Sequence, residues 1–232
     1  MTTELVSYAL EGQTAVVQVD DGKANALSDA VIDGIVTALA RAEREARAIV
    51  LVGRPDRFCA GFDLRVMMAS PDAAMKLLKA GAGMLMKLYG AAIPLVIACT
   101  GHALAGGALV VLTGDHRIGA AGAYKIGLNE VAIGLPVPRL AMELARDRLS
   151  KRALVDATLL ARIYDPEGAR AVGFLDAVVP AADVLARAKD EAARLAALAP
   201  TAFRATKLRL RGATIEHILS SLEADTEAIL HG

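Results

Sequence analysis

Two adjacent glycines, Gly106 and Gly107, follow one apolar run in the middle of the chain and begin a second run of helical length. The first run, residues 95–99, contains β-branched Val96 and Ile97, which predicts a strand buried on both faces. A helix that begins at these glycines has backbone N–H groups without intrahelical partners, and no side chain covers them. Such a turn favours an anion or a developing oxyanion. The alternative is that the glycines only permit close packing of strand and helix.

The same stretch, residues 91–112, is long and apolar enough to suggest a membrane span. Pro94, Gly101, His102 and the glycine pair interrupt it, and no Lys or Arg flanks it closely. We therefore reject a membrane-spanning interpretation.

A second glycine turn lies earlier in the chain, at Ala60 and Gly61. It comes after a predicted apolar strand at residues 48–52 and before a helix-like stretch. The chain therefore passes twice from strand through glycine turn to helix, which makes the two turns more informative together than either one alone.

One isolated acid, Glu130, stands in the mostly apolar loop formed by residues 127–136. We expect burial of its carboxyl group among Leu128, Val131 and Ile133, which would raise its pKa. A raised pKa suits a general base that works near neutral pH. The alternative is a carboxylate that faces solvent.

Other kinds of chemistry find little support in the sequence. Cys59 and Cys99 lie in apolar surroundings without CxxC spacing, which predicts reduced, buried thiols. His102 is interpreted as a turn residue, and the remaining histidines show no metal-ligand spacing. The sequence contains neither a GxSxG nucleophile motif nor a Walker-type phosphate loop. The histidines without metal-ligand spacing are His116, His217 and His231.

Composition points to a small-molecule partner. The chain has 232 residues, a formal net charge of zero, no Trp and four each of Tyr and Phe. This balance gives no support for binding to nucleic acid or to an anionic membrane. The N-terminal sequence shows no basic start followed by an apolar core, so we expect no secretory signal and a cytoplasmic protein.

The elements that must position these residues predict one α/β domain with a helical C-terminal part. A strand is expected at residues 14–20, a helix from the N-cap Ser28 to Arg44, and a methionine-rich helix at residues 72–90. From about residue 139 onward helices dominate. Their expected starts are Ser150, Asp165, Pro180 and Pro200, and a last amphipathic helix at residues 215–230 places Ile218, Leu219, Leu222 and Ile229 on one side.

Three ordered blocks, FCAGFDL at 58–64, GHALAGGAL at 101–109 and IGLNEVAIGL at 126–135, resemble the crotonase superfamily, the enoyl-CoA hydratase and isomerase family. The resemblance extends over nearly the whole chain. It implies an α/β fold of stacked β-β-α units, the crotonase or ClpP-like fold. It also implies a core domain at residues 1–190 and a helical extension at 191–232 that takes part in oligomer packing.

The resemblance further implies an acyl-CoA thioester as substrate, with a role in fatty-acid β-oxidation. No separate cofactor is expected, because coenzyme A is part of the substrate. The expected assembly is a homotrimer, or a hexamer formed as a dimer of trimers.

By the same resemblance, the backbone N–H groups of Ala60 and Gly106 form the oxyanion hole for the thioester carbonyl. Removing one such donor costs roughly 3–4 kcal/mol of transition-state stabilisation. Family hydratases carry two glutamates, and this chain has Leu109 at the first position and Glu130 at the second. Leu109 is expected to line the acyl pocket, and it can neither hold nor deprotonate a water molecule.

A single carboxylate suits isomerisation, because Glu130 could remove a proton from C2 and return it at C4. The GLNE sequence at 127–130, together with Leu109, also resembles the Δ3,Δ2-enoyl-CoA isomerases. We therefore favour an isomerase over a hydratase. A catalytically idle acyl-CoA-binding protein is a third possibility, since fold alone does not fix chemistry.

The remaining expected substrate contacts surround these groups. Backbone at Ala24 and Ala26 is expected to lie against coenzyme A, Lys23 and Lys207 to reach its phosphates, and Asn129 to touch the substrate. Asp63 is interpreted mainly as a helix cap beside the site. The glycine turn adds Gly61, Phe62 and Leu64 to the expected substrate-binding residues.

Overall fold

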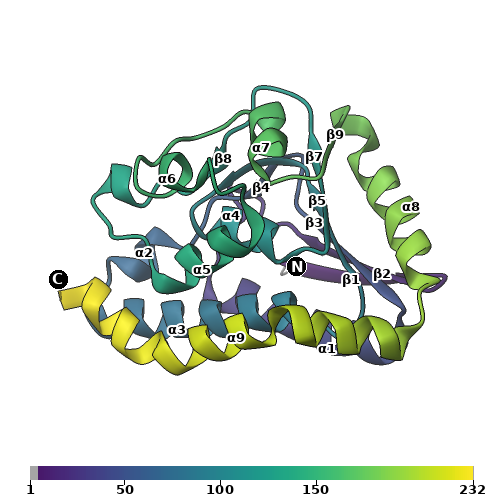
Figure 1. Ribbon diagram of the computed structural model, residues 1–232, viewed down its shortest axis with the longest axis horizontal. Helices are drawn as coiled ribbons and strands as arrows, with labels where there is room; N and C mark the ends of the chain where they lie inside the picture. Colours follow the sequence, from purple (N-terminus) through teal and green to yellow (C-terminus); the bar gives the residue numbers. More distant parts are fainter. Residues whose placement is uncertain (1–4, 232) are drawn as a thin grey trace.

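The computed structural model describes residues 5–231 and contains a six-stranded sheet with the order β1-β2-β3-β5-β7-β9 (Figure 1). The first two strands form an antiparallel hairpin, and every later pair is parallel. The strands are β1 (Val6–Glu11), β2 (Thr14–Val19), β3 (Ala48–Val52), β5 (Leu95–Cys99), β7 (His116–Ala120) and β9 (Ala177–Val179). Strands β3 and β5 are buried along their whole length, as their unbroken apolar sequences predict.

A second, smaller sheet has the order β4-β6-β8 and is also parallel. Its strands are β4 (Asp56–Cys59), β6 (Gly101–Leu104) and β8 (Ile126–Gly127). Each of these follows a strand of the large sheet after a short connection, so the chain repeatedly contributes one strand to each sheet. The helices that follow β4 and β6 complete the β-β-α units that the sequence predicts.

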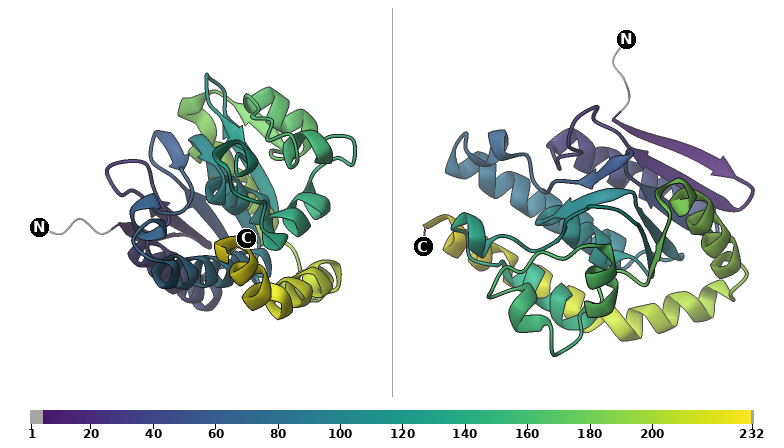
Figure 2. Two further views of the ribbon diagram at one scale, coloured as in Figure 1. Left: turned by 90° about the vertical axis from the view of Figure 1, so that its left-hand side faces the viewer. Right: turned by 90° about the horizontal axis from the view of Figure 1, so that it is seen from above.

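Helices cover both faces of the large sheet. On one face, α8 (Val184–Ala196) contributes a small-residue stripe that packs against alternate residues of β2, β3, β5 and β7. The other face meets the main core, which includes α1 (Asp29–Glu45), α3 (Pro71–Tyr89) and α4 (Gly106–Thr113). Figure 2 shows these layers from two further sides.

Local capping agrees with the sequence at several helix starts. The Ser28 side chain accepts a hydrogen bond from the Val31 N–H at the start of α1 (3.4 Å). Asp165 likewise accepts from the Gly168 N–H (2.7 Å) at α7. Ser150 does not cap a helix, since α6 begins only at Leu154. The shorter helices are α2 (Leu64–Met67), α5 (Arg139–Arg148), α6 (Leu154–Ala157), α7 (Pro166–Val172), η1 (Val131–Ile133) and η2 (Ala181–Asp183).

The C-terminal part differs from the prediction, because α9 (Pro200–His231) is one continuous helix rather than two. Ile218 is buried as expected, but Leu219 is 48% exposed, and the side chain of Ile229 lies outside the described residues. The expected boundary at residue 191 is wrong, because it falls inside α8, which packs on the sheet as far as Ala196. The extension therefore begins at Pro200.

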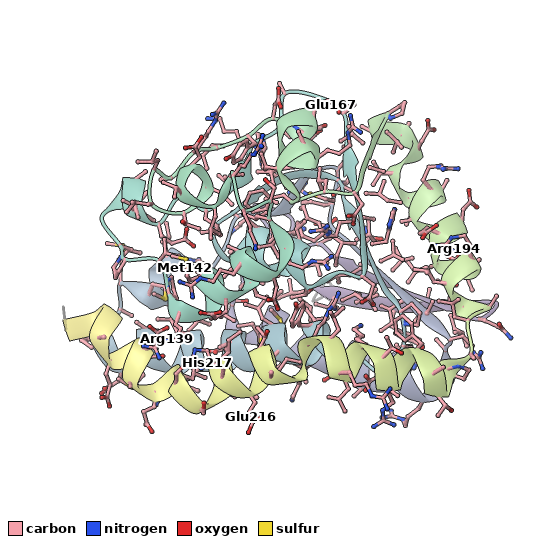
Figure 3. The ribbon with its side chains drawn as sticks, in the orientation of Figure 1. Arg139, Met142, Glu167, Arg194, Glu216 and His217 are labelled. Atoms are coloured by element: carbon pink, nitrogen blue, oxygen red, sulfur yellow. The ribbon has the colours of Figure 1, made fainter. Side chains whose placement is uncertain are left out.

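Helix α9 packs along α3 and α5. Figure 3 shows Arg139, at the start of α5, close to α9, and Glu216 projecting outward from α9. A buried ionic cluster attaches α9 to the sheet. Lys207 Nζ lies 2.7 Å from Asp115 Oδ2, and Arg211 lies 3.1 Å from Asp115 Oδ1. Asp115 Oδ2 also accepts from the Leu95 N–H (2.8 Å) at the start of β5.

Candidate active site

The two glycine turns lie side by side because β4 and β6 are parallel neighbours and each turn directly follows its strand. A Cβ added to Gly61 would lie 3.3 Å from the Gly106 nitrogen and 3.1 Å from the Leu104 carbonyl oxygen. Gly61 also has φ +96°, a conformation that L side chains rarely adopt. Both the close neighbours and the positive φ therefore require glycine at residue 61. The same distances show that the turn at residues 60–61 lies against the turn at residues 106–107.

The Gly106 N–H is presented at the first residue of α4. Its predecessor, Ala105, has φ 48° and ψ −122°, and no side chain caps the helix. A non-glycine residue in such a conformation is strained by roughly 1–3 kcal/mol, a feature that often accompanies functional sites. Within residues 5–231 the Gly106 N–H has no hydrogen-bond acceptor. It can therefore donate to a substrate oxygen, reinforced by the positive end of the helix.

The second donor is not Ala60, and this sequence prediction is wrong. The Ala60 N–H donates to the Ala24 carbonyl oxygen (3.1 Å), so it is already used within the fold. The segment containing Ala24 and Leu27 runs beside the turn, a neighbour that spacing within the FCAGFDL block could not reveal.

The Phe62 N–H takes the place of Ala60 as the available donor. Leu27 pairs with Phe62 as a parallel bridge, in which Leu27 N–H donates to Gly61 O (2.8 Å) and Asp63 N–H donates to Leu27 O (3.1 Å). In a parallel bridge of this kind the N–H of the central residue points away from the neighbour. Across the described part of the chain, the Phe62 N–H meets no acceptor.

Strand β8 brings the segment that carries Glu130 next to the second glycine turn. Strand β8 pairs Gly127 with Leu104, and the Gly127 carbonyl accepts from the Ala105 N–H (3.0 Å). The chain therefore leaves this sheet beside Gly106 and places Glu130 three residues later, immediately before the short helix η1.

The Glu130 carboxyl group is buried and incompletely satisfied. The residue is 6% exposed, and its Oε2 atom has no hydrogen-bond partner among residues 5–231. Burial raises the pKa of Glu130 above its usual value because the charged form loses hydration. The predicted neighbours are only partly correct: Leu128 is buried, whereas Val131 and Ile133 are 42% and 53% exposed.

Two further residues of the predicted site lie close in sequence or space to these groups. The Asn129 Oδ1 atom is buried without a partner in the described region, so it could accept a hydrogen bond from a ligand. Leu109 follows Gly106 by nearly one turn of α4, is 2% exposed and belongs to the main core cluster. Helix α4 carries no ionisable residue, so it supplies no second carboxylate.

The segment expected to meet coenzyme A is organised by Asn25, whose role the sequence analysis missed. Asn25 is fully buried with φ 52°, and its Nδ2 donates to the carbonyl oxygens of Val19 (2.8 Å) and Arg57 (3.1 Å). Asparagine tolerates positive φ better than most residues, which was the available signal. Lys23 is exposed just before it.

The Ala26 backbone already makes two hydrogen bonds within the fold, and its expected contact with coenzyme A stays a prediction. Its N–H donates to Asp21 Oδ2 (3.1 Å), and its carbonyl accepts from the Ser28 N–H (2.9 Å). The Ala24 carbonyl is likewise occupied by Ala60. Each of these carbonyl oxygens keeps a second lone pair, with which it could accept a hydrogen bond from a ligand.

Two other predictions have opposite outcomes. Asp63 caps α2 by accepting from the Arg65 N–H (2.9 Å), as expected, while the neighbouring Leu64 is 65% exposed. Lys207 is only 6% exposed and pairs with Asp115, so the prediction that it reaches the coenzyme A phosphates is wrong. Burial lowers the pKa of Lys207 to about 8, against the opposing effect of Asp115.

The thiols and histidines form no alternative site in the described region. Cys59 and Cys99 are free and buried, and burial raises the pKa of each thiol to about 12. Thiols with such pKa values are poor nucleophiles. Among residues 5–231 no group of His, Cys, Asp and Glu could hold a metal ion, and no helix is long and apolar enough to cross a membrane.

The proteins that are similar in sequence to this chain include enoyl-CoA hydratases and isomerases by name. The sequence model of the enoyl-CoA hydratase/isomerase family matches residues 10–230. Human mitochondrial enoyl-CoA delta isomerase 1 is 33% identical over 218 residues, which cover 92% of this chain and 72% of the human protein. A putative enoyl-CoA hydratase from Thermus thermophilus is 31% identical over 204 residues, which cover 85% of this chain and 80% of that protein.

Solved structures give the same result. An enoyl-CoA hydratase/isomerase family protein from Pseudomonas syringae has a TM-score of 0.94 and 38% identity, covering 97% of this chain and 98% of the other. Human mitochondrial delta3-delta2-enoyl-CoA isomerase has a TM-score of 0.93 and 31% identity, covering 97% of this chain and 90% of the other.

The stacked β-β-α units and the paired glycine turns thus define a crotonase-fold protein, as these structural matches confirm. The chain belongs to the enoyl-CoA hydratase/isomerase family of the crotonase superfamily and is an acyl-CoA-processing enzyme.

Proposed function

We propose that this enzyme is a Δ3,Δ2-enoyl-CoA isomerase in which Glu130 is the only proton-transferring carboxylate. The observation that carries the proposal is the buried Glu130 Oε2 atom, which has no hydrogen-bond partner among the described residues. Helix α4 meanwhile carries Leu109 at the position where family hydratases have their other glutamate. The human relatives named as isomerases support the same choice.

In this mechanism the Phe62 and Gly106 N–H groups bind the thioester oxygen of a 3-enoyl-CoA. Glu130 removes a proton from C2, and the electron pair of that C–H bond is delocalised as a dienolate onto the thioester oxygen. The protonated Glu130 then returns the proton at C4. The double bond moves from C3–C4 to C2–C3, the carbonyl is restored, and Glu130 is ionised again.

The two backbone donors bind the thioester oxygen more strongly as negative charge develops on it, which lowers the barrier to proton removal. The raised pKa of Glu130 makes it a stronger base than an exposed carboxylate. Asn129 and the segment around Lys23 and Ala24 are proposed to contact the rest of the acyl-CoA, with no cofactor besides the substrate's own coenzyme A.

A hydratase is the second candidate, favoured by the Thermus thermophilus relative that is named a putative hydratase. In that case other groups would have to orient the water molecule, because residue 109 is leucine and has no carboxylate. Assembly as a homotrimer or hexamer through α9 is a further proposal that follows from the family resemblance. A cytoplasmic location is a separate proposal.

The test is a parallel assay of the wild-type enzyme on 3-enoyl-CoA and 2-enoyl-CoA substrates, with Glu130→Gln and Leu109→Glu. We expect isomerisation by the wild type and at least about 100-fold loss in Glu130→Gln, because proton transfer contributes roughly 10²–10⁴-fold. Acyl-CoA binding should persist in Glu130→Gln. We expect Leu109→Glu to gain hydration of 2-enoyl-CoA.

Two results would refute this assignment. One is efficient hydration by the wild type without isomerisation of 3-enoyl-CoA. The other is full activity in Glu130→Gln, which would show that another group transfers the proton.

A further inference from the structure

The Phe62 ring lies between two glycines that belong to different helices. A Cβ added to Gly81 on α3 would overlap Phe62 Cε1 and lie 2.6 Å from Cζ. A Cβ added to Gly106 on α4 would lie 3.1 Å from Phe62 Cδ2 and 3.2 Å from Cε2. The ring therefore occupies the space that side chains at both positions would need.

Gly81 stands in the interior of a 19-residue helix, where glycine is a costly choice. Glycine at such a position is roughly 0.5–1 kcal/mol less favourable than alanine. Gly83, two residues further on, has nothing within 4 Å of an added Cβ, so its neighbours would accept alanine. Gly81 differs because the space beside it is filled by Phe62.

Helix α3 is a firm support for that contact. It packs against α1, α4 and α9, and Ser70 caps its start by accepting from the Ala73 N–H (3.1 Å). Its C-terminal half is largely buried, including Gly81, Ala82 and Met84. A side chain added at Gly81 would therefore displace the half-buried Phe62 ring more readily than it would displace the helix.

The ring and the proposed oxyanion donor belong to the same residue. The Phe62 nitrogen is joined through Cα to the Cβ that carries the ring. The ring also lies beside the first turn of α4, which supplies the Gly106 donor. We propose that Gly81 is a positioning residue for the oxyanion hole: by leaving room for the Phe62 ring, it sets the Phe62 N–H relative to the Gly106 N–H. This inference rests on the proposed use of these two donors.

The decisive variant is Gly81→Ala, with Gly83→Ala as the matched control on the same helix. We expect kcat of Gly81→Ala on 3-enoyl-CoA to fall by about 10–100-fold, since misplacement of about 1 Å can cost 10²-fold. KM should change less than about threefold, because the remaining acyl-CoA contacts do not involve Gly81. Gly83→Ala should keep the wild-type kcat.

The absorption spectrum of a bound thioester tests the geometry of the proposed oxyanion hole without any catalytic reaction. The thioester 4-dimethylaminocinnamoyl-CoA absorbs at longer wavelength when its carbonyl oxygen is polarised by hydrogen-bond donors. Bound to wild type and Gly83→Ala it should show the same red shift, and bound to Gly81→Ala a smaller one. A merely structural defect would lower the amount of folded protein but would not change the spectrum of the saturated complex.

Phe62→Leu, made in the wild type and in Gly81→Ala, tests whether the Phe62 ring transmits the effect of residue 81 to the donor. Leucine keeps the N–H group and leaves space for a Cβ at residue 81. Gly81→Ala/Phe62→Leu should have the same kcat and red shift as Phe62→Leu alone, even if Gly81→Ala itself does not fold. A further loss in the double variant would overturn the proposal, as would wild-type kcat and red shift in Gly81→Ala.

A wild type without isomerase activity would refute the proposed function instead. The red shifts of the Gly81 and Phe62 variants would still decide whether Gly81 positions the donor.

Discussion

Glu130, the proposed proton-transferring residue, carries a thermodynamic penalty. Its carboxyl group is almost fully buried and lacks a partner for Oε2 among the described residues, so ionisation there is disfavoured. The same absence of partners keeps the group available for a substrate proton. The residue therefore gains basicity by giving up some stability of the folded protein.

The pH dependence follows from the raised pKa of Glu130. Only the ionised form can accept the C2 proton, so kcat/KM should fall as the pH drops through a pKa above the ordinary value of 4.5. Stability has the opposite sign: the folded state holds this proton to a higher pH than the unfolded state, so its contribution to stability is lost as pH rises through that window.

Glu130→Gln removes this titration and should raise the free energy of unfolding at neutral pH while lowering activity. Urea denaturation of the two proteins at pH 5 and pH 7 measures the difference, which should be larger at pH 7. A wild type that loses no stability relative to Glu130→Gln over this range would contradict the assignment.

Residue-scale predictions from the sequence succeeded where the signal was local. Glu130 is buried and Asp63 is a helix cap, as their residue types and positions indicated, although two of the three neighbours expected to bury Glu130 are exposed. The errors at Ala60 and Lys207 have a different origin. Their partners, Ala24 and Asp115, are distant in sequence, and nothing in the local pattern reveals that these groups are already occupied.

At the scale of elements, the buried strands and the capped helices were predictable because periodicity and cap residues act within a few positions. Strands β4, β6 and β8 were not, since each has at most four residues and forms only by pairing with the others. The long helix α9 was divided in the prediction because its apolar stripe begins only near residue 215. Its first half is instead anchored by Lys207 and Arg211.

This anchoring predicts a large effect of Asp115→Asn. The substitution leaves two buried cations without their counter-charge, and breaking such a pair typically costs about 3–5 kcal/mol. Denaturant titration should show this loss in the free energy of unfolding. Glu223→Gln, which removes an exposed ion pair between α9 and Lys79 of α3, is the control for a surface contact of the same helix and should change little. Equal effects of both substitutions would show that the buried cluster has no special role.

For the whole molecule, the outer side of α9 raises the question of assembly. Leu208 and Leu210 are 65% and 73% exposed, and the family resemblance predicts a trimer or hexamer that uses this extension. We expect sedimentation to give three or six times the chain mass of 24.1 kDa. Leu210→Glu should shift the protein toward smaller species, whereas Glu216→Gln on the same helix should not. A wild type that sediments as a monomer at all concentrations would refute this assembly.

The overall architecture was accessible from the sequence mainly through the three ordered blocks, which together indicated the family. Physical patterns alone indicated an α/β domain but not two stacked sheets, because the smaller sheet has too few residues to produce its own periodicity.

Both proposed oxygen-binding groups are main-chain amides at turns that parallel strands bring together. Among the standard amino acids only proline lacks this N–H group, so most substitutions at these two positions leave both donors in place, and their geometry depends on the path of the main chain. The exposed apolar rim at Val131, Ile133 and Leu135 is free of that constraint. Substitutions of Glu130 and of this rim could therefore change the reaction or the acyl group accepted while the two proposed backbone donors stay in place.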